Sequence, residues 1–237
     1  MTWVFVHIPK AAGTSLKNAL ESRFGAEHIH YDYQRPMARP AWRRNLDCAV
    51  ASCIGPRIAQ PVVFGHFLAG KYARFTGRGF VPRSGSRYLV FLRDPLQRAV
   101  SHYLFWKRTH LGGHRIWERF SRENWSLERF LLGSEHADFQ SQFLWRFPIE
   151  QFDFIGLAEH YSESLQLLGG LFPEFKTLEY RADNCNTAHA IASPYRVDPG
   201  TEAEFKVLNR GDYALYARAK AWFSETRAVY SRSGEAA

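Results

Sequence analysis

The feature that most constrains the fold is a short apolar run followed at once by a loop of small and polar residues. Trp3 to His7 is an apolar, β-branched and aromatic run of the kind that forms a buried parallel strand. Apolar side chains at helical spacing then run to Phe24. The loop between them reads Pro9-Lys10-Ala11-Ala12-Gly13-Thr14-Ser15. A strand, a tight loop and a helix in this order turn backbone N–H groups and the positive end of the helix toward an anion.

Strand and helix patterns alternate along the rest of the chain. Three further apolar runs predict strands: Pro61 to Phe64, Tyr88 to Leu92 and Phe152 to Leu157. Asp94-Pro95 supplies an N-cap and a first-turn proline for a helix, and Tyr161 to Phe172 has a helical pattern. This alternation predicts an α/β fold, in which a central parallel sheet is flanked by helices.

The remaining segments indicate a single domain. Glu202 to Tyr230 has the pattern of two helices that separate near Arg210-Gly211-Asp212. Two stretches are expected to be irregular basic insertions, Gln34 to Arg44 and Gly77 to Gly85. The chain has 237 residues, 46% of them hydrophobic, and no linker typical of a domain boundary. We therefore expect one domain over residues 1–230, with a disordered tail over residues 231–237.

Charge and cysteine content narrow the classes of function. The formal net charge of +8 makes the surface attractive to a polyanion, such as nucleic acid, an acidic membrane or a phosphorylated cofactor. Cys48, Cys53 and Cys185 have neither zinc-ligand nor CxxC spacing, which suggests idle thiols in a reducing compartment. There is no basic leader and no apolar run of membrane-spanning length. We expect a soluble, cytoplasmic protein without a transmembrane segment or a metal site.

The loop has the composition that a phosphate or sulfate group requires. Lys10 brings a mobile positive charge, Gly13 permits close approach of the backbone, and Thr14 and Ser15 carry hydroxyl donors. Ala11 and Ala12 add no bulk to the concave side. A nucleoside triphosphatase loop reads GxxxxGK[ST], with the lysine directly before the hydroxyl residue, whereas Lys10 precedes Gly13 here. This order argues against ATP hydrolysis. The alternative is a tight turn with an incidental lysine.

A second candidate anion site follows the strand that ends at Leu92. Arg93 stands at the carboxyl end of that strand, the edge at which open α/β sheets bind their ligands. Ser101 lies on the helix that follows, 101 − 93 = 8 positions later. A guanidinium group and a hydroxyl group can share one phosphate.

These two motifs resemble those of the sulfotransferases that use 3′-phosphoadenosine 5′-phosphosulfate, in particular the branch of heparan sulfate 2-O-sulfotransferase and its bacterial relatives. The segment from Phe5 to Leu16 is similar to that family's 5′-phosphosulfate loop, and Leu92 to Ser101 is similar to its 3′-phosphate site. Weaker similarity extends over most of the chain. The resemblance implies a fold like that of P-loop kinases. The membrane anchor and paired cysteines of the animal enzymes have no counterpart here, which leaves the acceptor open.

Candidate catalytic residues follow from the chemistry of sulfuryl transfer. The reaction needs positive charge on the departing phosphate and a base for the acceptor hydroxyl, and it requires no metal. Lys10 is the candidate for the charge. For the base we favour His66, which ends a predicted strand in Gly65-His66 and which the resemblance also indicates, although a histidine between two phenylalanines can equally be a core residue. His7 is expected to be structural.

Three weaker candidates complete the predicted site. His102 is a possible residue of the acceptor side, and Asn186 a possible donor contact, because relatives place donor contacts in the loop after a short strand at Thr177 to Tyr180. The basic and aromatic stretch from Trp106 to Trp125 could line an acceptor cleft for a sugar or an acidic glycan, or could be an amphipathic helix with a solvated basic side.

The sequence thus favours an enzyme that transfers sulfate to a hydroxyl group, most simply that of a carbohydrate or glycolipid, and no nucleic-acid partner is expected. Two alternatives remain open. A phosphotransferase of related fold would need an acidic magnesium ligand and a lysine beside the loop hydroxyl. A non-catalytic protein that binds polyanions would also explain the charge of +8.

Overall fold

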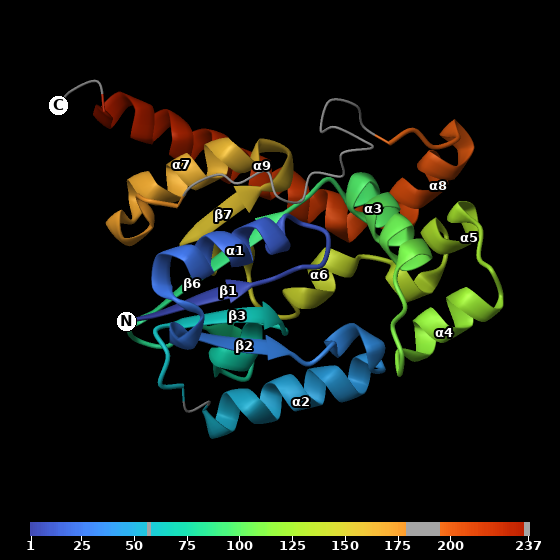
Figure 1. The fold of residues 1–237 in the computed structure, drawn as a ribbon, viewed down its shortest axis with the longest axis horizontal. Coiled ribbons are helices and arrows are strands. Elements are labelled where there is room, and N and C mark those ends of the chain that lie inside the picture. The colour runs from blue at the N-terminus through green and yellow to red at the C-terminus, as the bar shows by residue number, and fades with distance from the viewer. Residues whose placement is uncertain (56–57, 179–194, 235–237) are drawn as a thin grey trace.

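A five-stranded parallel sheet forms the centre of the molecule (Figure 1). The computed structural model describes residues 1–55, 58–178 and 195–234. The strand order is β2-β3-β1-β6-β7, and all neighbours are parallel. The strands are β1 (Thr2–Val6), β2 (Ile29–Tyr33), β3 (Val62–His66), β6 (Ser86–Leu92) and β7 (Phe154–Leu157). The predicted α/β fold with a central parallel sheet is confirmed.

The inner strands are almost continuously apolar because both faces of the sheet are covered. Val4, Phe5 and Val6 of β1 are each at most 2% exposed, Val62 to Phe64 of β3 are fully buried, and Tyr88 to Leu92 of β6 are at most 3% exposed. The edge strand β2 was not predicted from the sequence. Its residues IHYDY mix polar and aromatic side chains, which an edge strand tolerates and which hides it from a search for apolar runs.

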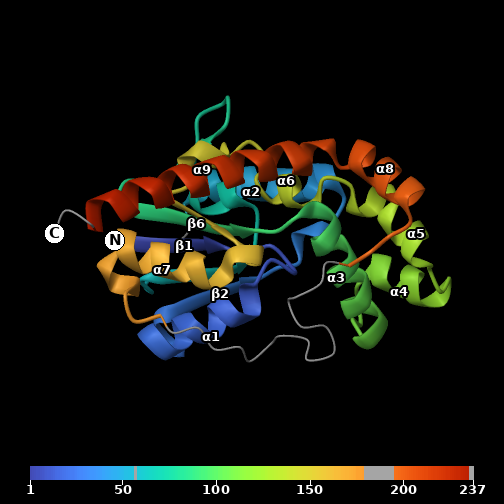
Figure 2. The same ribbon diagram turned by 90° about the horizontal axis from the view of Figure 1, so that it is seen from above.

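Helices cover both faces of the sheet (Figure 2). The helices α1 (Gly13–Phe24) and α7 (Tyr161–Leu171) lie on one face. The helices α2 (Ala41–Ile54), α6 (Phe139–Phe143) and α9 (Arg210–Gly234) lie on the other. This is the three-layer arrangement expected of a parallel sheet. None of the helices in the described ranges is long and apolar enough to cross a membrane.

A helical lobe lies beyond the carboxyl ends of the strands. It contains α3 (Pro95–Arg108), α4 (Arg115–Arg122), α5 (Leu127–Leu131) and α8 (Pro199–Leu208). Its interior is a separate aromatic cluster in which Trp106, Trp117 and Trp125 are 3 to 8% exposed. The indole of Trp117 donates to the carbonyl of Trp106 at 3.2 Å. These three tryptophan rings belong to the core of the lobe and do not line a cleft.

Several expected irregular segments are ordered elements. Gln34 to Arg44 contains a short 3₁₀ helix, Pro36–Ala38, and the first turn of α2. Within Gly77 to Gly85, β5 (Phe80–Val81) pairs with β4 (Arg74–Phe75) as an antiparallel hairpin. Arginine and proline are frequent in the first segment and glycine in the second, and this local composition gives no sign of the tertiary contacts that order them.

The C-terminal helices agree with the sequence except at the end of the chain. Asn209 separates α8 from α9, close to the predicted break. The tail prediction is wrong for residues 231–234, which continue α9, and Arg232 there donates to the carbonyl of Ala228 at 3.1 Å. Of the strand predicted from Thr177 to Tyr180, residues 177 and 178 are described, and neither is in a strand.

Candidate functional site

The loop between β1 and α1 is built around two residues in the left-handed region. Lys10 has φ 70° and Ala12 has φ 61°, so the backbone reverses twice before the helix begins at Gly13. No side chain caps α1, and its first turn carries no acidic residue. The helix therefore presents its first N–H groups and its positive end without an internal counter-charge. Both features favour an anion at this point.

Gly13 is required because of the histidine beneath it. A Cβ atom at this position would lie 1.7 Å from Nε2 of His7, so a side chain cannot be accommodated while the imidazole is in place. Ala11 is small for a similar reason, since its methyl group is buried in the core at 1% exposure. The loop is thus packed from below by the sheet, while Thr14 and Ser15 remain at least partly accessible.

Lys10 lies in a strongly positive and partly buried environment. Its ammonium group is 4.7 Å from the centre of the Phe105 ring on α3. Burial, and then the positive charges of Arg93 and Arg108, lower the pKa of Lys10 to about 8. Cations that lower one another's pKa in this way are stabilised together by a bound anion.

Arg93 joins the loop to the start of α3. Its guanidinium Nη1 donates to the carbonyl of Lys10 at 3.2 Å, although the two residues are 83 positions apart. The side chain of Gln140, which is fully buried, clamps the Arg93 backbone: it accepts from the N–H at 3.0 Å and donates to the carbonyl at 2.8 Å. Asp94 caps α3 by accepting from the N–H of Gln97 at 3.0 Å, as the sequence predicts. Arg93 is therefore positioned from both sides.

Glu159 balances the charge of Arg93. Its carboxylate lies 3.7 Å from Nε of Arg93 and accepts from the N–H of Asp94 at 3.0 Å and from the hydroxyl of Tyr216 at 2.9 Å. The side chain of Arg93 is 26% exposed, so an incoming anion can reach it.

Ser101 shares a face of α3 with Phe105, because residues four apart in a helix lie one above the other. Phe105 contacts the ammonium group of Lys10, so this face of α3 is turned toward the loop. Ser101 is 7% exposed. Ser101 therefore lies on the side of α3 that is turned toward the loop.

His66 ends β3 next to the loop. Its ring centre is 4.4 Å from that of His7 and 4.8 Å from that of Tyr33, and its Nε2 is buried without a hydrogen-bond partner. Burial, and then the charge of Arg35, lower the pKa of His66 to about 4, against an opposing effect of Asp32. His66 is thus neutral at neutral pH. The pKa of His7 is also well below its ordinary value, owing first to burial and then to His66 and Lys10.

The glycine before His66 is fixed by the neighbouring strand. A Cβ on Gly65 would lie 2.0 Å from the backbone oxygen of Asp32, so only glycine fits there. The carboxylate of Asp32 is buried, and it binds Lys71 at 2.5 Å and the hydroxyl of Tyr72 at 2.8 Å. This network ties β2 to the 3₁₀ helix Ala69–Tyr72, which follows β3 and His66 in the chain.

Other predicted residues lie elsewhere. His102 is 6% exposed, its Nδ1 is 3.4 Å from Nη1 of the buried Arg98, and it packs on Trp106, so it is a core residue and does not face an acceptor. Asn186 and the loop around it lie outside the described residues.

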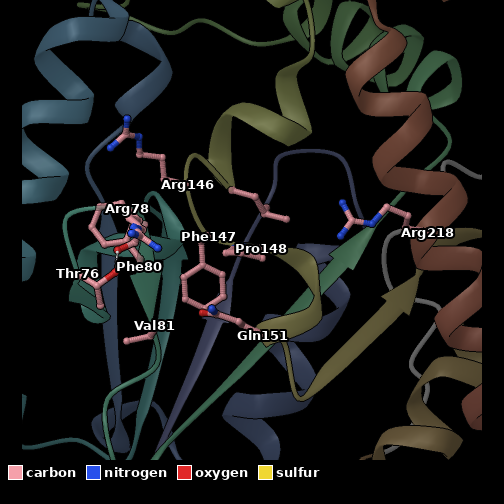
Figure 3. Close-up of a pocket in the computed structure, with 11 residues that line it drawn as sticks. Thr76, Arg78, Phe80, Val81, Arg146, Phe147, Pro148, Gln151 and Arg218 are labelled. Atoms are coloured by element: carbon pink, nitrogen blue, oxygen red, sulfur yellow. Dashed lines mark hydrogen bonds between the residues drawn. The ribbon is translucent and has the colours of Figure 1, made fainter.

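A cavity of about 560 Å³ opens on the α9 side of the sheet (Figure 3). It lies between the β4–β5 hairpin, the segment after α6 and Arg218 of α9. Its lining contains three arginines but neither a lysine nor a histidine, and none of the predicted site residues. The candidate chemistry is therefore at the strand ends and not in this cavity.

Comparison with known protein families identifies the family of the chain. A sequence model described as "Sulfotransferase family" matches residues 2–216, which is nearly the whole chain. The chain belongs to the sulfotransferase family. A search of the curated proteins found no match. The matched range of this sulfotransferase includes the loop, His66 and Arg93.

Sequence reasoning missed several residues of this sulfotransferase site. Gln140 and Glu159, which hold Arg93, and Phe105, which contacts Lys10, carry no local motif that marks them. Tyr33 and Arg35 were hidden because β2 and the segment after it were not recognised.

Proposed function

We propose that this sulfotransferase moves a sulfuryl group from 3′-phosphoadenosine 5′-phosphosulfate to a hydroxyl group of a carbohydrate or glycolipid, as in the branch of heparan sulfate 2-O-sulfotransferase. The observation that carries the proposal is the hydrogen bond of 3.2 Å from Arg93 to the carbonyl of Lys10. It brings two anion-binding elements, far apart in the sequence, to one edge of the sheet. A nucleotide that carries phosphates at both its 5′ and 3′ positions matches two such elements.

The residues at the strand ends fit this donor. The uncapped start of α1 and the loop from Lys10 to Ser15 would hold the 5′-phosphosulfate through Lys10, Ala11, Ala12, Gly13, Thr14 and Ser15. Arg93 and Ser101 would hold the 3′-phosphate, and Asn186 remains a predicted donor contact. The mutual repulsion among Lys10, Arg93 and Arg108, visible in the lowered pKa of Lys10, is relieved by the negative charge of such a ligand.

Lys10 acts on the leaving group. When bound, the donor supplies the sulfuryl group and a phosphate that departs with increasing negative charge. The ammonium group of Lys10 stabilises that charge more strongly in the transition state than in the ground state, and this difference is what accelerates the reaction. The Phe105 ring and the carbonyl hydrogen bond from Arg93 hold the lysine and its backbone in place.

His66 acts on the acceptor. Its unpaired Nε2 takes the proton of the acceptor hydroxyl as the oxygen bonds to sulfur. A base with a pKa of about 4 is weak, but the negative charge of a bound donor close by stabilises the imidazolium and raises this pKa. His66 is therefore a stronger base in the ternary complex than in the free protein.

The surroundings of His66 suit a sugar. Tyr33 is 41% exposed and lies beside His66, and an aromatic ring in this position offers a surface for the apolar face of a sugar ring. Arg35 contributes positive charge to the same region. These two residues support a carbohydrate acceptor that carries negative charge.

Calorimetry with 3′-phosphoadenosine 5′-phosphate, AMP and ATP tests the donor. We expect clear preference for the 3′-phosphorylated nucleotide, and R93A should lose about 10- to 100-fold in affinity for it while AMP is little affected, as for loss of a charged hydrogen bond. R122A is the matched control, because Arg122 is 74% exposed on α4. Equal binding of AMP and the 3′-phosphorylated nucleotide by the wild type would show that the donor is a different one.

A further inference from the structure

The outer side of α2 carries a stripe of exposed apolar side chains. Trp42, Leu46, Val50 and Ile54 are 67%, 50%, 48% and 79% exposed. They recur every four residues, so they form one ridge on the helix, about 18 Å long at 1.5 Å per residue. The buried positions Cys48 and Ser52 face the opposite way, toward the body of the protein. We call these four residues the α2 ridge.

The position of α2 leaves the ridge accessible. The helix runs along the outer edge of the molecule in Figure 1, beyond the edge strand β2. Ser52 of its inner side donates to the carbonyl of Ala73 at 2.9 Å, which fixes the rotation of the helix. The exposure of the ridge is therefore built into the fold. Patches of this kind on a protein surface indicate an interaction site.

We propose that the α2 ridge pairs with the α2 ridge of a second copy of this chain in an antiparallel homodimer. The ridge is self-complementary about its midpoint, which falls at Cys48. A two-fold axis there sets Leu46 against Val50 of the second copy and Trp42 against Ile54 of the second copy. Side chains spaced four apart form the ridges that interlock in the commonest class of helix packing. This inference does not depend on the proposed sulfuryl transfer.

The charges beside the ridge are paired with one another. Asp47 borders the ridge and is held by Arg39 at 2.7 Å and Arg43 at 3.2 Å. Paired charges around an apolar centre are typical of the rim of a protein interface.

The size of the ridge suits a weak or moderate dimer. Four side chains with these exposures present on the order of several hundred Å² of apolar surface, near the largest patch of a typical monomer. A stable interface buries roughly 800 Å² on each partner, and somewhat more than half of that is apolar. The ridge supplies the apolar centre, and the arginines and Asp47 around it supply the polar part.

Sedimentation equilibrium of the full chain tests the proposal. We expect a dimer that dissociates on dilution into the micromolar range. L46E and V50K should each raise the dissociation constant of the dimer by a large factor, so that the chain is monomeric. The matched control is V207E, because Val207 is 72% exposed on α8, away from α2, and this variant should dimerise as the wild type does. Circular dichroism of each variant confirms folding, and partly exposed positions tolerate the charge.

Mixing the two monomeric variants tests the antiparallel register. A mixture of L46E and V50K should form a heterodimer, because the new glutamate of one copy meets the new lysine of the other. The free thiol of Cys53, exposed beside the ridge, gives an independent readout, since its alkylation should slow as the concentration of wild type rises. Any one of four results would overturn the proposal. The wild type could stay monomeric at about 100 μM, V207E could have the same effect as the ridge variants, or the mixture of L46E and V50K could remain monomeric. The fourth result is ridge-dependent binding to anionic vesicles without dimerisation.

Discussion

The lowered pKa of Lys10 gives a quantitative test of the phosphate loop. In the free protein this pKa is about 8, owing first to burial and then to the charges of Arg93 and Arg108. A bound phosphate reverses the electrostatic balance and returns the pKa toward its ordinary value of about 10.4. At pH 9 the free lysine is then about one-tenth protonated and the bound lysine almost fully protonated, so binding takes up about 0.9 proton.

The direction in which the affinity changes with pH follows from this lowered pKa. The charged lysine binds the phosphate and predominates below pH 8, so affinity should be nearly constant up to that pH. Above it, affinity should fall about tenfold for each pH unit. Calorimetry with 3′-phosphoadenosine 5′-phosphate in buffers of different ionisation enthalpy measures both quantities.

Two variants separate Lys10 from other titrating groups. K10R keeps its charge over the whole range, so its binding should show neither the proton uptake nor the loss of affinity above pH 8. R93A removes one cause of the lowered pKa, so the onset should move to higher pH. No proton uptake by the wild type at pH 9, or an equal uptake by K10R, would refute this account of the loop.

Three further perturbations test the site and its support. His66→Ala should lower kcat by about 100-fold or more while leaving the affinity for 3′-phosphoadenosine 5′-phosphate unchanged, and an active variant would remove His66 as the base. Gly13→Ala should destabilise the fold by about 1–3 kcal/mol in thermal or urea unfolding, because its Cβ meets the His7 ring, and His7→Ala in the same chain should restore part of the loss. Burial lowers the pKa of His136 to about 3, so only the unfolded chain takes up this proton between about pH 6.5 and 3. This histidine alone should lower the stability by up to about 1.4 kcal/mol for each unit that the pH falls, and His136→Phe should show a slope that is shallower by this amount.

Local patterns made the core of the site predictable. The strand, loop and helix around Gly13, and the Asp94 cap with its proline, depend on residues within a few positions of one another, so the sequence displays them directly. The same holds for β1, β3, β6 and β7, whose apolar runs reflect burial on both faces of the sheet.

Contacts between distant segments could not be read in this way. The clamp of Gln140 on Arg93 joins residues 47 positions apart, and nothing in the sequence near Arg93 points to Gln140 as its partner. The edge strand β2 needs no apolar run, and α2 buries Cys48 and Ser52 while exposing Trp42 and Ile54, the reverse of what hydrophobicity alone predicts.

The sequence by itself determined that the chain has a strand, a loop of small and polar residues and a helix in that order, and a parallel α/β core, because both depend on short-range order along the backbone. Only the tertiary structure decided which residues surround the loop. It set Arg93 on the carbonyl of Lys10, placed the neutral His66 against His7, and turned the α2 ridge outward. Each of these arrangements depends on how the strands are ordered in the sheet, and that order is fixed by the packing of the whole chain.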